Sequence, residues 1–194
     1  MSTKFKLKQF IRRYYMKLGL KRDEIKLVDY SLEWNEEFQQ TRNAIEEQTG
    51  LAAERIEHIG STAIKDMPAK PIIDILVGVD NLKKVDESLL RDFSKVGFLR
   101  LKVERPEEKV LAKFTDDTYQ EKTHFIHLVD YQKDLWNNLL FFRDYLNANE
   151  EVKHRYMNLK QEYINNTATG LNINDYTKYK EDFVKNIFSI RNNN

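Results

Sequence analysis

The run PIIDILVGV, at residues 71–79, constrains the fold of this chain more than any other stretch. It is apolar on both alternating faces except at Asp74, which is typical of a strand in the centre of a sheet that helices cover on both sides. Burying a carboxylate is costly unless it is paired, hydrogen-bonded or bound to a metal. Asp74 is therefore a candidate functional residue. The structural alternative is a carboxylate that caps a turn or pairs with Lys70.

The composition bounds the class of protein. A chain of 194 residues fits one domain, or one domain with a helical appendage. A net charge of +1 predicts no general affinity for nucleic acids, and the absence of cysteine excludes disulfides, thiol nucleophiles and cysteine zinc sites. The sequence shows no signal peptide and no apolar stretch near the roughly 20 residues of a membrane span. We therefore expect a cytoplasmic protein, which the lack of cysteine also fits.

Residues 1–24 form a basic extension, with no acidic residue before Asp23. Its apolar residues recur at helical spacing: Leu7, Phe10, Ile11, Tyr14 and Leu18. A basic amphipathic helix can bind RNA or anionic lipid. A helix that packs on its own domain shows the same stripe, so both interpretations stay open.

Residues 25–130 alternate between strand and helix patterns and predict an α/β (α+β) core with a mixed sheet. The predicted strands are 25–30, 56–59, 71–79, 98–103, 109–114 and 122–129, and the predicted helices are 31–50 and 82–96. From 131 to 194 the apolar spacing is helical throughout, with a polar break at 165–174. We expect this helical part to pack on the core as one compact unit.

A candidate phosphate site lies between the second and third predicted strands. Gly60 lets the backbone approach an anion closely, while Ser61 and Thr62 supply hydroxyl and amide donors. Asp74, on the adjacent strand, could hold Mg²⁺ against the phosphate. Lys70 lies beside that strand. The helical part offers further cations, namely Arg143, Lys160 and Lys180, of which Arg143 and Lys180 are the candidate phosphate clamps.

Three histidines fall on the predicted strands. His58 lies next to the glycine-serine turn, and His124 and His127 share one strand. Their spacing of three places His124 and His127 on opposite faces, so one metal ion cannot easily bind both. His127 is a candidate ligand or general base, and a hydrogen-bonded structural histidine is the alternative.

At these residues the chain resembles the GrpB family. The resemblance is carried by IEHIGSTA (56–63), AKPIIDILV (69–77), VDYSLEW (28–34), THFIHLV (123–129) and FRDYL (142–146), and by Tyr176, Lys180 and Phe183. It covers residues 25–187. The family in turn resembles nucleotidyltransferases of the DNA polymerase β type, which implies a nucleotidyltransferase-like core. Some relatives are fused to dephospho-coenzyme A kinase, which implies a nucleotide-like ligand.

In that superfamily a glycine-serine turn binds the nucleotide, and carboxylates bind two Mg²⁺ ions. By position, Gly60 and Ser61 match the turn and Asp74 matches the first carboxylate, but Leu76 stands at the second carboxylate position. The third carboxylate position falls on the strand of His127. A histidine side chain is a better ligand for Mn²⁺ or Zn²⁺ than for Mg²⁺. Glu57 is a further candidate carboxylate, beside His58. The resemblance implies Mg²⁺ or Mn²⁺ at Asp74 and His127, with an atypical ligand set.

Three functions remain open on the sequence. The first is transfer of a nucleotidyl or phosphoryl group from a nucleoside triphosphate. The second is a binding module for a nucleotide or a coenzyme-A-like ligand, which Leu76 favours. The third is association with RNA or a membrane through the basic extension.

Overall fold

The computed structural model describes residues 17–21, 24–103, 105–166 and 173–193. Residues 1–16 of the predicted N-terminal helix lie outside the described residues, and the prediction is wrong for residues 17–21, which are not helical and end in the short strand Leu20–Lys21. No helix within the described ranges is long and apolar enough to cross a membrane.

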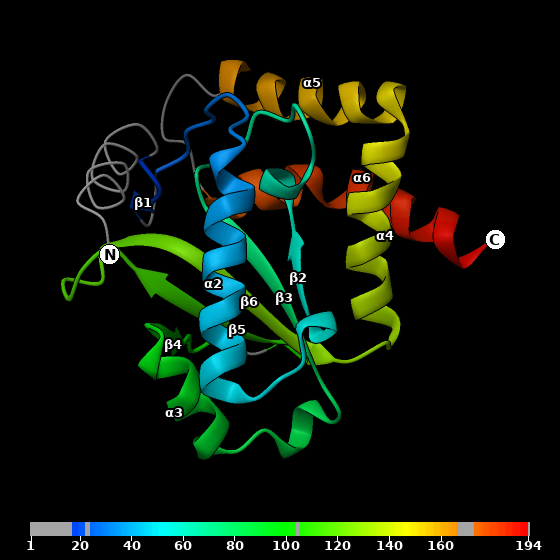
Figure 1. The fold of residues 1–194 in the computed structure, drawn as a ribbon. Coiled ribbons are helices and arrows are strands. Elements are labelled where there is room, and N and C mark those ends of the chain that lie inside the picture. Colours follow the sequence, from blue (N-terminus) through cyan, green and yellow to red (C-terminus); the bar gives the residue numbers. More distant parts are fainter. Residues whose placement is uncertain (1–16, 22–23, 104, 167–172, 194) are drawn as a thin grey trace.

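One mixed sheet forms the centre of the molecule (Figure 1). Its strand order is β2–β3–β6–β5–β4, and a short β1 also pairs with β6. These strands are β1 (Leu20–Lys21), β2 (Ile56–Ile59), β3 (Ile73–Val79), β4 (Phe98–Arg100), β5 (Lys109–Phe114) and β6 (Glu121–Asp130). Only β3 and β6 run parallel, while the other pairs are antiparallel. The mixed sheet agrees with the sequence prediction, and the apolar run 71–79 forms a central strand.

Alternation along the strands divides the sheet into two chemically different faces. Helices α2 (Glu33–Thr49) and α3 (Glu87–Lys95) cover one face, and α2 lies in front of the sheet in Figure 1. The stripe of α2 that faces the sheet is buried and consists of Trp34, Phe38, Thr41 and Ile45. It packs against strand residues that include Ile73, Ile75 and Ile126. This large apolar core fixes which strand residues face the other side.

The remaining helices are α4 (Asp134–Ala148), α5 (Glu150–Asn166) and α6 (Ile173–Asn192). In Figure 1, α4 runs alongside the β2 edge and α6 passes behind the sheet. Trp136 of α4 packs on Ile59, Leu76 and Val129 of the sheet. A third apolar cluster joins the segment after β2, at Ile64 and Met67, to all three helices. The helical part thus closes over the second face of the sheet.

The predicted strand 25–30 is wrong. This segment makes a single isolated bridge, in which the amides and carbonyls of Val28 and Ala69 pair at 2.9 and 3.0 Å. Two residues beyond Ala69 lies Pro71, which has no N–H to donate, so the pairing cannot continue as a ladder in that direction.

Two other predicted boundaries change. The predicted helix 82–96 is instead a short 3₁₀ turn at Leu82–Lys84 followed by α3. Val85 is extended, and the side chain of Asp86 caps the new helix by accepting from the Leu89 amide at 3.0 Å. The predicted strand 98–103 ends at Arg100, before the charged turn that leads to β5.

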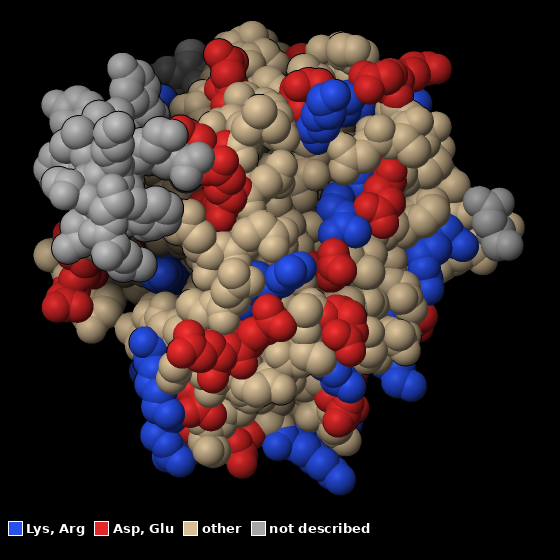
Figure 2. Space-filling model, viewed as in Figure 1, with Lys and Arg blue, Asp and Glu red and all other residues tan. Residues whose placement is uncertain are grey.

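Acidic and basic side chains are interspersed over the face shown in Figure 2. This distribution agrees with the net charge of +1. The charged side chains on this face therefore do not by themselves indicate a binding site.

Candidate functional site

Gly60 brings the backbone of the turn directly against Asp74. Ile59 and Asp74 are register partners in β2 and β3, so Gly60 follows at the end of the paired segment. Gly60 has φ +71° and ψ −171°, a conformation essentially restricted to glycine. A Cβ atom placed on Gly60 would overlap the carboxylate oxygen Asp74 Oδ2. The structure therefore joins the glycine-serine turn and the carboxylate that the sequence singled out.

Asp74 lies on the sheet face that the helical part covers, next to His127. Asp74 and Leu76 share this face, and Leu76 is the register partner of His127 in the parallel pair. The distance from His127 Nε2 to Asp74 Oδ1 is 3.6 Å. On the other side of the ring, His127 Nδ1 lies 2.7 Å from Glu108 Oε2. His127 thus stands between two carboxylates.

The charges in this row reinforce one another. Burial by itself would lower the pKa of His127, but hydrogen bonds and attraction from Asp74 and Glu108 raise it to about 9. Burial would raise the pKa of Glu108, but His127 and Arg105 lower it to about 2. His127 therefore carries a proton at neutral pH. An imidazolium can donate a proton or supply positive charge, so His127 is poorly suited to act as a general base.

One lysine contacts this turn, and two others interact electrostatically with that lysine or with Asp74. Lys160 of α5 is 1% exposed, and its Nζ lies 3.3 Å from Ser61 Oγ and 2.5 Å from the Pro68 carbonyl oxygen. Lys70 precedes β3, and Lys180 projects from α6. The Nζ atoms of Lys70 and Lys180 lie 5.3 and 4.3 Å from the centre of the Tyr176 ring.

Burial lowers the pKa values of all three lysines, and repulsion by other lysines lowers those of Lys70 and Lys160 further. Burial, followed by repulsion from Lys180 and Lys70, lowers the pKa of Lys160 to about 7. Burial and then Lys180 lower the pKa of Lys70 to about 8, although Asp74 acts in the opposite direction. Burial lowers the pKa of Lys180 to about 8, and Asp74 again opposes the shift. The three lysines and Asp74 therefore interact electrostatically as one group.

His58 and Thr62 lie apart from this group. His58 is the register partner of Ile75 and points to the α2 face, where its Nδ1 lies 3.2 Å from Asn35 Oδ1 and its Nε2 lies 3.0 Å from Thr62 Oγ1. Burial lowers the pKa of His58 to about 4, so the ring is neutral at physiological pH. Strand alternation explains why His58 sits on the face away from Asp74. The Thr62 hydroxyl, predicted to contact phosphate, instead contacts the ring of His58.

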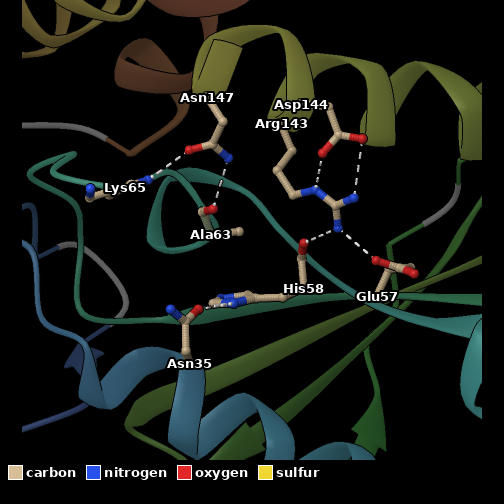
Figure 3. Close-up of polar contacts among 8 residues, drawn as sticks. All are labelled: Asn35, Glu57, His58, Ala63, Lys65, Arg143, Asp144 and Asn147. Carbon is tan, nitrogen blue, oxygen red and sulfur yellow. Dashed lines mark hydrogen bonds and ion pairs between the residues drawn. The ribbon is translucent and has the colours of Figure 1, made fainter.

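Arg143 and Glu57 form an ion pair that attaches α4 to β2 (Figure 3). Arg143 Nη1 donates to Glu57 Oε2 at 2.6 Å and to the His58 carbonyl oxygen at 2.9 Å, while its Nε donates to Asp144 at 2.7 Å. These contacts occupy the guanidinium that was a candidate phosphate clamp. They also occupy the carboxylate that was a candidate metal ligand, so both residues fit a structural role better.

Asn147, one turn further along α4, holds the segment that follows the turn (Figure 3). Its side-chain oxygen accepts from the Lys65 amide at 2.9 Å, and its nitrogen donates to the Ala63 carbonyl oxygen at 3.2 Å. Lys160 binds the same segment at Ser61 and Pro68. Side chains of α4 and α5 thus hold the glycine-serine turn and the segment after it in position.

The residues do not fit the two-metal site that the resemblance implies. Leu76, at the second carboxylate position, is fully buried. Both ring nitrogens of His127 face a carboxylate, so Asp74, His127 and Glu108 form a row and do not converge on a point. Within the described ranges, no group of three or more histidine, cysteine, aspartate or glutamate residues is arranged to hold a metal.

Two residues were missed by sequence reasoning. Glu108 is not among the candidate residues that the sequence singles out, and Lys160 is among the helical cations but is not one of the candidate phosphate clamps. Glu108 lies just before β5, on the side of that strand that carries Val110, whose register partner is His127. Alternation extended back from β5 could have found it. No local pattern places Lys160 beside Ser61, because that contact depends on how the helices pack.

A separate hollow of about 910 Å³ lies around Lys17, Trp34, Pro71 and Glu121. Its lining contains neither Asp74 nor the three lysines.

Fold and site together define a mixed α/β protein in which a buried lysine and two partly buried lysines lie near a glycine-serine turn and a strand carboxylate. The family model described as GrpB protein matches residues 24–189, so the chain belongs to the GrpB family. The resemblance seen in the sequence is thereby confirmed.

Individual comparisons agree. The chain is 40% identical over 177 residues to the glutamate-rich protein GrpB of Alkalihalophilus pseudofirmus, a match that covers 89% of this chain and 98% of that protein. The crystal structure of the conserved protein GrpB from Enterococcus faecalis matches with a TM-score of 0.70 and 27% identity, over 84% of this chain and 95% of that one. The mixed α/β fold is therefore shared with a solved relative. Cid1 poly(U) polymerase bound to MgGTP matches at a TM-score of 0.48 and 11% identity, over 81% of this chain and 47% of that one, which is too weak to indicate an activity.

Proposed function

We propose that this protein binds a phosphate-containing ligand of the nucleotide class at the Gly60–Ser61 turn and transfers a nucleotidyl or phosphoryl group from it. The observation that carries the proposal is a group of three lysines that interact electrostatically: Lys160 at the turn, and Lys70 and Lys180 at the Tyr176 ring, where both feel the charge of Asp74. Buried lysines that repel one another are costly to a fold, and a polyanion relieves that cost. The backbone N–H groups of a glycine-serine turn are a suitable seat for phosphate.

Each residue of the site has a role in such a transfer. An acceptor hydroxyl would give its proton to Asp74 as its oxygen bonds to the phosphorus under attack. The bond from that phosphorus to its leaving oxygen would break, and pyrophosphate or a nucleoside diphosphate would depart with the electron pair. The lysines stabilise the departing negative charge, and the imidazolium of His127 keeps Asp74 oriented toward the turn.

Binding without turnover is the second candidate, and Leu76 is the observation that favours it. A buried leucine at the second carboxylate position removes a hard-metal ligand that two-metal transfer uses. In that case the same lysines would hold a nucleotide or a coenzyme-A-like ligand. The association with RNA or a membrane depends on residues 1–16, which lie outside the described residues.

Labelled nucleoside triphosphates distinguish the candidates. We expect thermal stabilisation by at least one of ATP, GTP, CTP, UTP or coenzyme A; a ligand at 100 times its dissociation constant adds about 2.7 kcal/mol. Transfer predicts labelled product that Asp74→Asn abolishes, while ligand binding by the variant survives. Asp117→Asn, at an exposed loop position, is the matched control. Stabilisation without product would support the binding module, and a lack of stabilisation by any of these ligands would reject both candidates.

A further inference from the structure

The positive charge of this site comes from protein side chains. The two-metal arrangement does not fit, because Leu76 is apolar and buried and because His127 separates Asp74 from Glu108. A phosphate ligand still needs its charge neutralised, since a buried anion without a partner is costly. The residues available for that task are the three lysines.

Lys70 and Lys180 are the key pair. They come from different parts of the chain, one before β3 and one on α6, yet both ammonium groups lie against the Tyr176 ring. In the part of the chain that the structure describes, neither ammonium group forms a hydrogen bond or an ion pair. By contrast, Lys153 of α5, which is more deeply buried than either of them, is paired with Glu150 at 2.6 Å. Lys70 and Lys180 therefore hold donor capacity that the fold itself does not use.

Lys160 completes the arrangement at the turn. Its Nζ contacts Ser61 Oγ and the Pro68 carbonyl oxygen, so the ammonium group is held in one position. An ammonium group has three donors. The two contacts leave one donor for a ligand oxygen that also meets the Ser61 hydroxyl.

We propose that Lys70, Lys160 and Lys180 form a lysine centre that binds the phosphates of a polyphosphate ligand directly, with no requirement for a divalent cation. The proposal rests on the proposed function for the presence of such a ligand, and adds that the protein supplies the counter-charge. The lowered pKa values of the three lysines support it. An anion at the centre favours their charged forms, so binding near neutral pH takes up protons from solution.

Calorimetric titration tests the lysine centre, with ATP and inorganic tripolyphosphate as probes, each in excess Mg²⁺ and in EDTA. Tripolyphosphate probes the centre alone, and ATP adds the nucleoside. We expect both to bind in EDTA with affinity within about tenfold of that in Mg²⁺. Lys180→Met should weaken binding by about tenfold or more in both conditions, the effect of losing a charge-assisted hydrogen bond. Lys178→Met, an exposed change on the same helix, should leave binding unchanged.

The outcomes separate this inference from the proposed function. Binding of ATP that needs Mg²⁺ and ignores Lys180→Met overturns the lysine centre and leaves nucleotide binding intact. Absence of binding by every probe, in either condition, overturns both. If Lys180→Met does not fold, as judged by its melting curve, Lys70→Met carries the same test. Proton uptake, measured by repeating the titration in buffers of different ionisation enthalpy, gives an independent readout.

Discussion

Gly60 is the residue at which backbone conformation and the site depend on each other most directly. Its φ of +71° resembles the φ of +69° at Gly50, the residue that ends α2. A Cβ on Gly50 would meet nothing within 4 Å, whereas a Cβ on Gly60 would overlap the Asp74 carboxylate. The two glycines also differ in ψ, which is 8° at Gly50 and −171° at Gly60, so a side chain at Gly60 meets both a less favourable backbone conformation and the Asp74 carboxylate.

Gly60→Ala should destabilise the fold more than Gly50→Ala. Alanine in the left-handed helical conformation of Gly50 costs about 1 kcal/mol, and alanine in the extended positive-φ conformation of Gly60 costs about 1–3 kcal/mol. The overlap with Asp74 adds a further cost of about 1–3 kcal/mol at Gly60 alone. Urea unfolding of both variants measures the difference. Equal losses would contradict the additional costs expected at Gly60.

The ion pair between Glu108 and His127 gives a prediction about pH. The pKa of His127 is raised from 6.5 to about 9, so its contribution to stability is complete below pH 6.5 and is lost as the pH rises through 9. The pKa of Glu108 is lowered from 4.5 to about 2, so its contribution is present above pH 4.5 and is lost as the pH falls through 2. The ion pair therefore contributes most to the free energy of unfolding between pH 4.5 and 6.5.

Glu108→Gln should lower the free energy of unfolding by about 3 kcal/mol near pH 6, since removing one partner leaves a buried charge behind. The loss should shrink above pH 9, where His127 is neutral in both proteins. Unfolding by urea at pH 6 and pH 10 measures it, and Glu107→Gln, at the exposed neighbouring position, is the control. A loss that is equal at the two pH values would contradict the ion pair.

At the scale of elements, α4 holds β2 and the turn through polar contacts that come from one face of the helix. Arg143 reaches Glu57 and the His58 carbonyl oxygen, and Asn147 reaches Ala63 and Lys65. These are contacts between segments more than 80 residues apart, and they fix the position of the turn relative to α5 and its Lys160.

Arg143→Met should therefore cost about 2–3 kcal/mol of stability, because Glu57 loses its partner and a backbone carbonyl loses its donor. It should also weaken ligand binding without removing any residue of the lysine centre. Chemical unfolding and calorimetry measure the two effects. Arg155→Met changes an exposed arginine on α5 and should have little effect on either. A variant that loses stability and keeps full affinity would show that the turn does not depend on α4.

Sequence patterns predicted the elements well where one periodicity applied throughout. The apolar run at β3, the stripe of α2 and the opposite orientations of His124 and His127 all follow from alternation or helical spacing. The prediction of a strand at 25–30 was wrong because a hydrophobic pattern does not show whether a neighbouring segment can form a ladder of backbone hydrogen bonds. The contact of Lys160 with the turn was not predicted for a related reason, because only the packing of α5 on the turn places Lys160 beside Ser61.

At the scale of the molecule, the sheet and the helical part share their apolar interior. Trp136 packs on β2, β3 and β6 residues, and Ile64 and Met67 lie among the side chains of α4, α5 and α6. We predict that the chain unfolds in one cooperative transition, with a calorimetric enthalpy equal to the van't Hoff enthalpy. Scanning calorimetry checks this, and two resolved transitions would show that residues 25–130 and 131–194 fold separately.

Lys160 meets Ser61 across 99 residues of chain, and Lys180 lies further along still. A ribosome adds residues in order, so a growing chain that has just completed β6 already contains the turn, Asp74 and His127, but none of the cations of α5 and α6. That intermediate already contains His127 and Lys70, but it lacks Lys160 and Lys180 and so has only one cation of the proposed lysine centre. If the lysine centre binds a polyphosphate as proposed, we expect ligand capture only by molecules whose α6 has emerged and docked, so that chains that stall earlier in synthesis would not compete for the ligand.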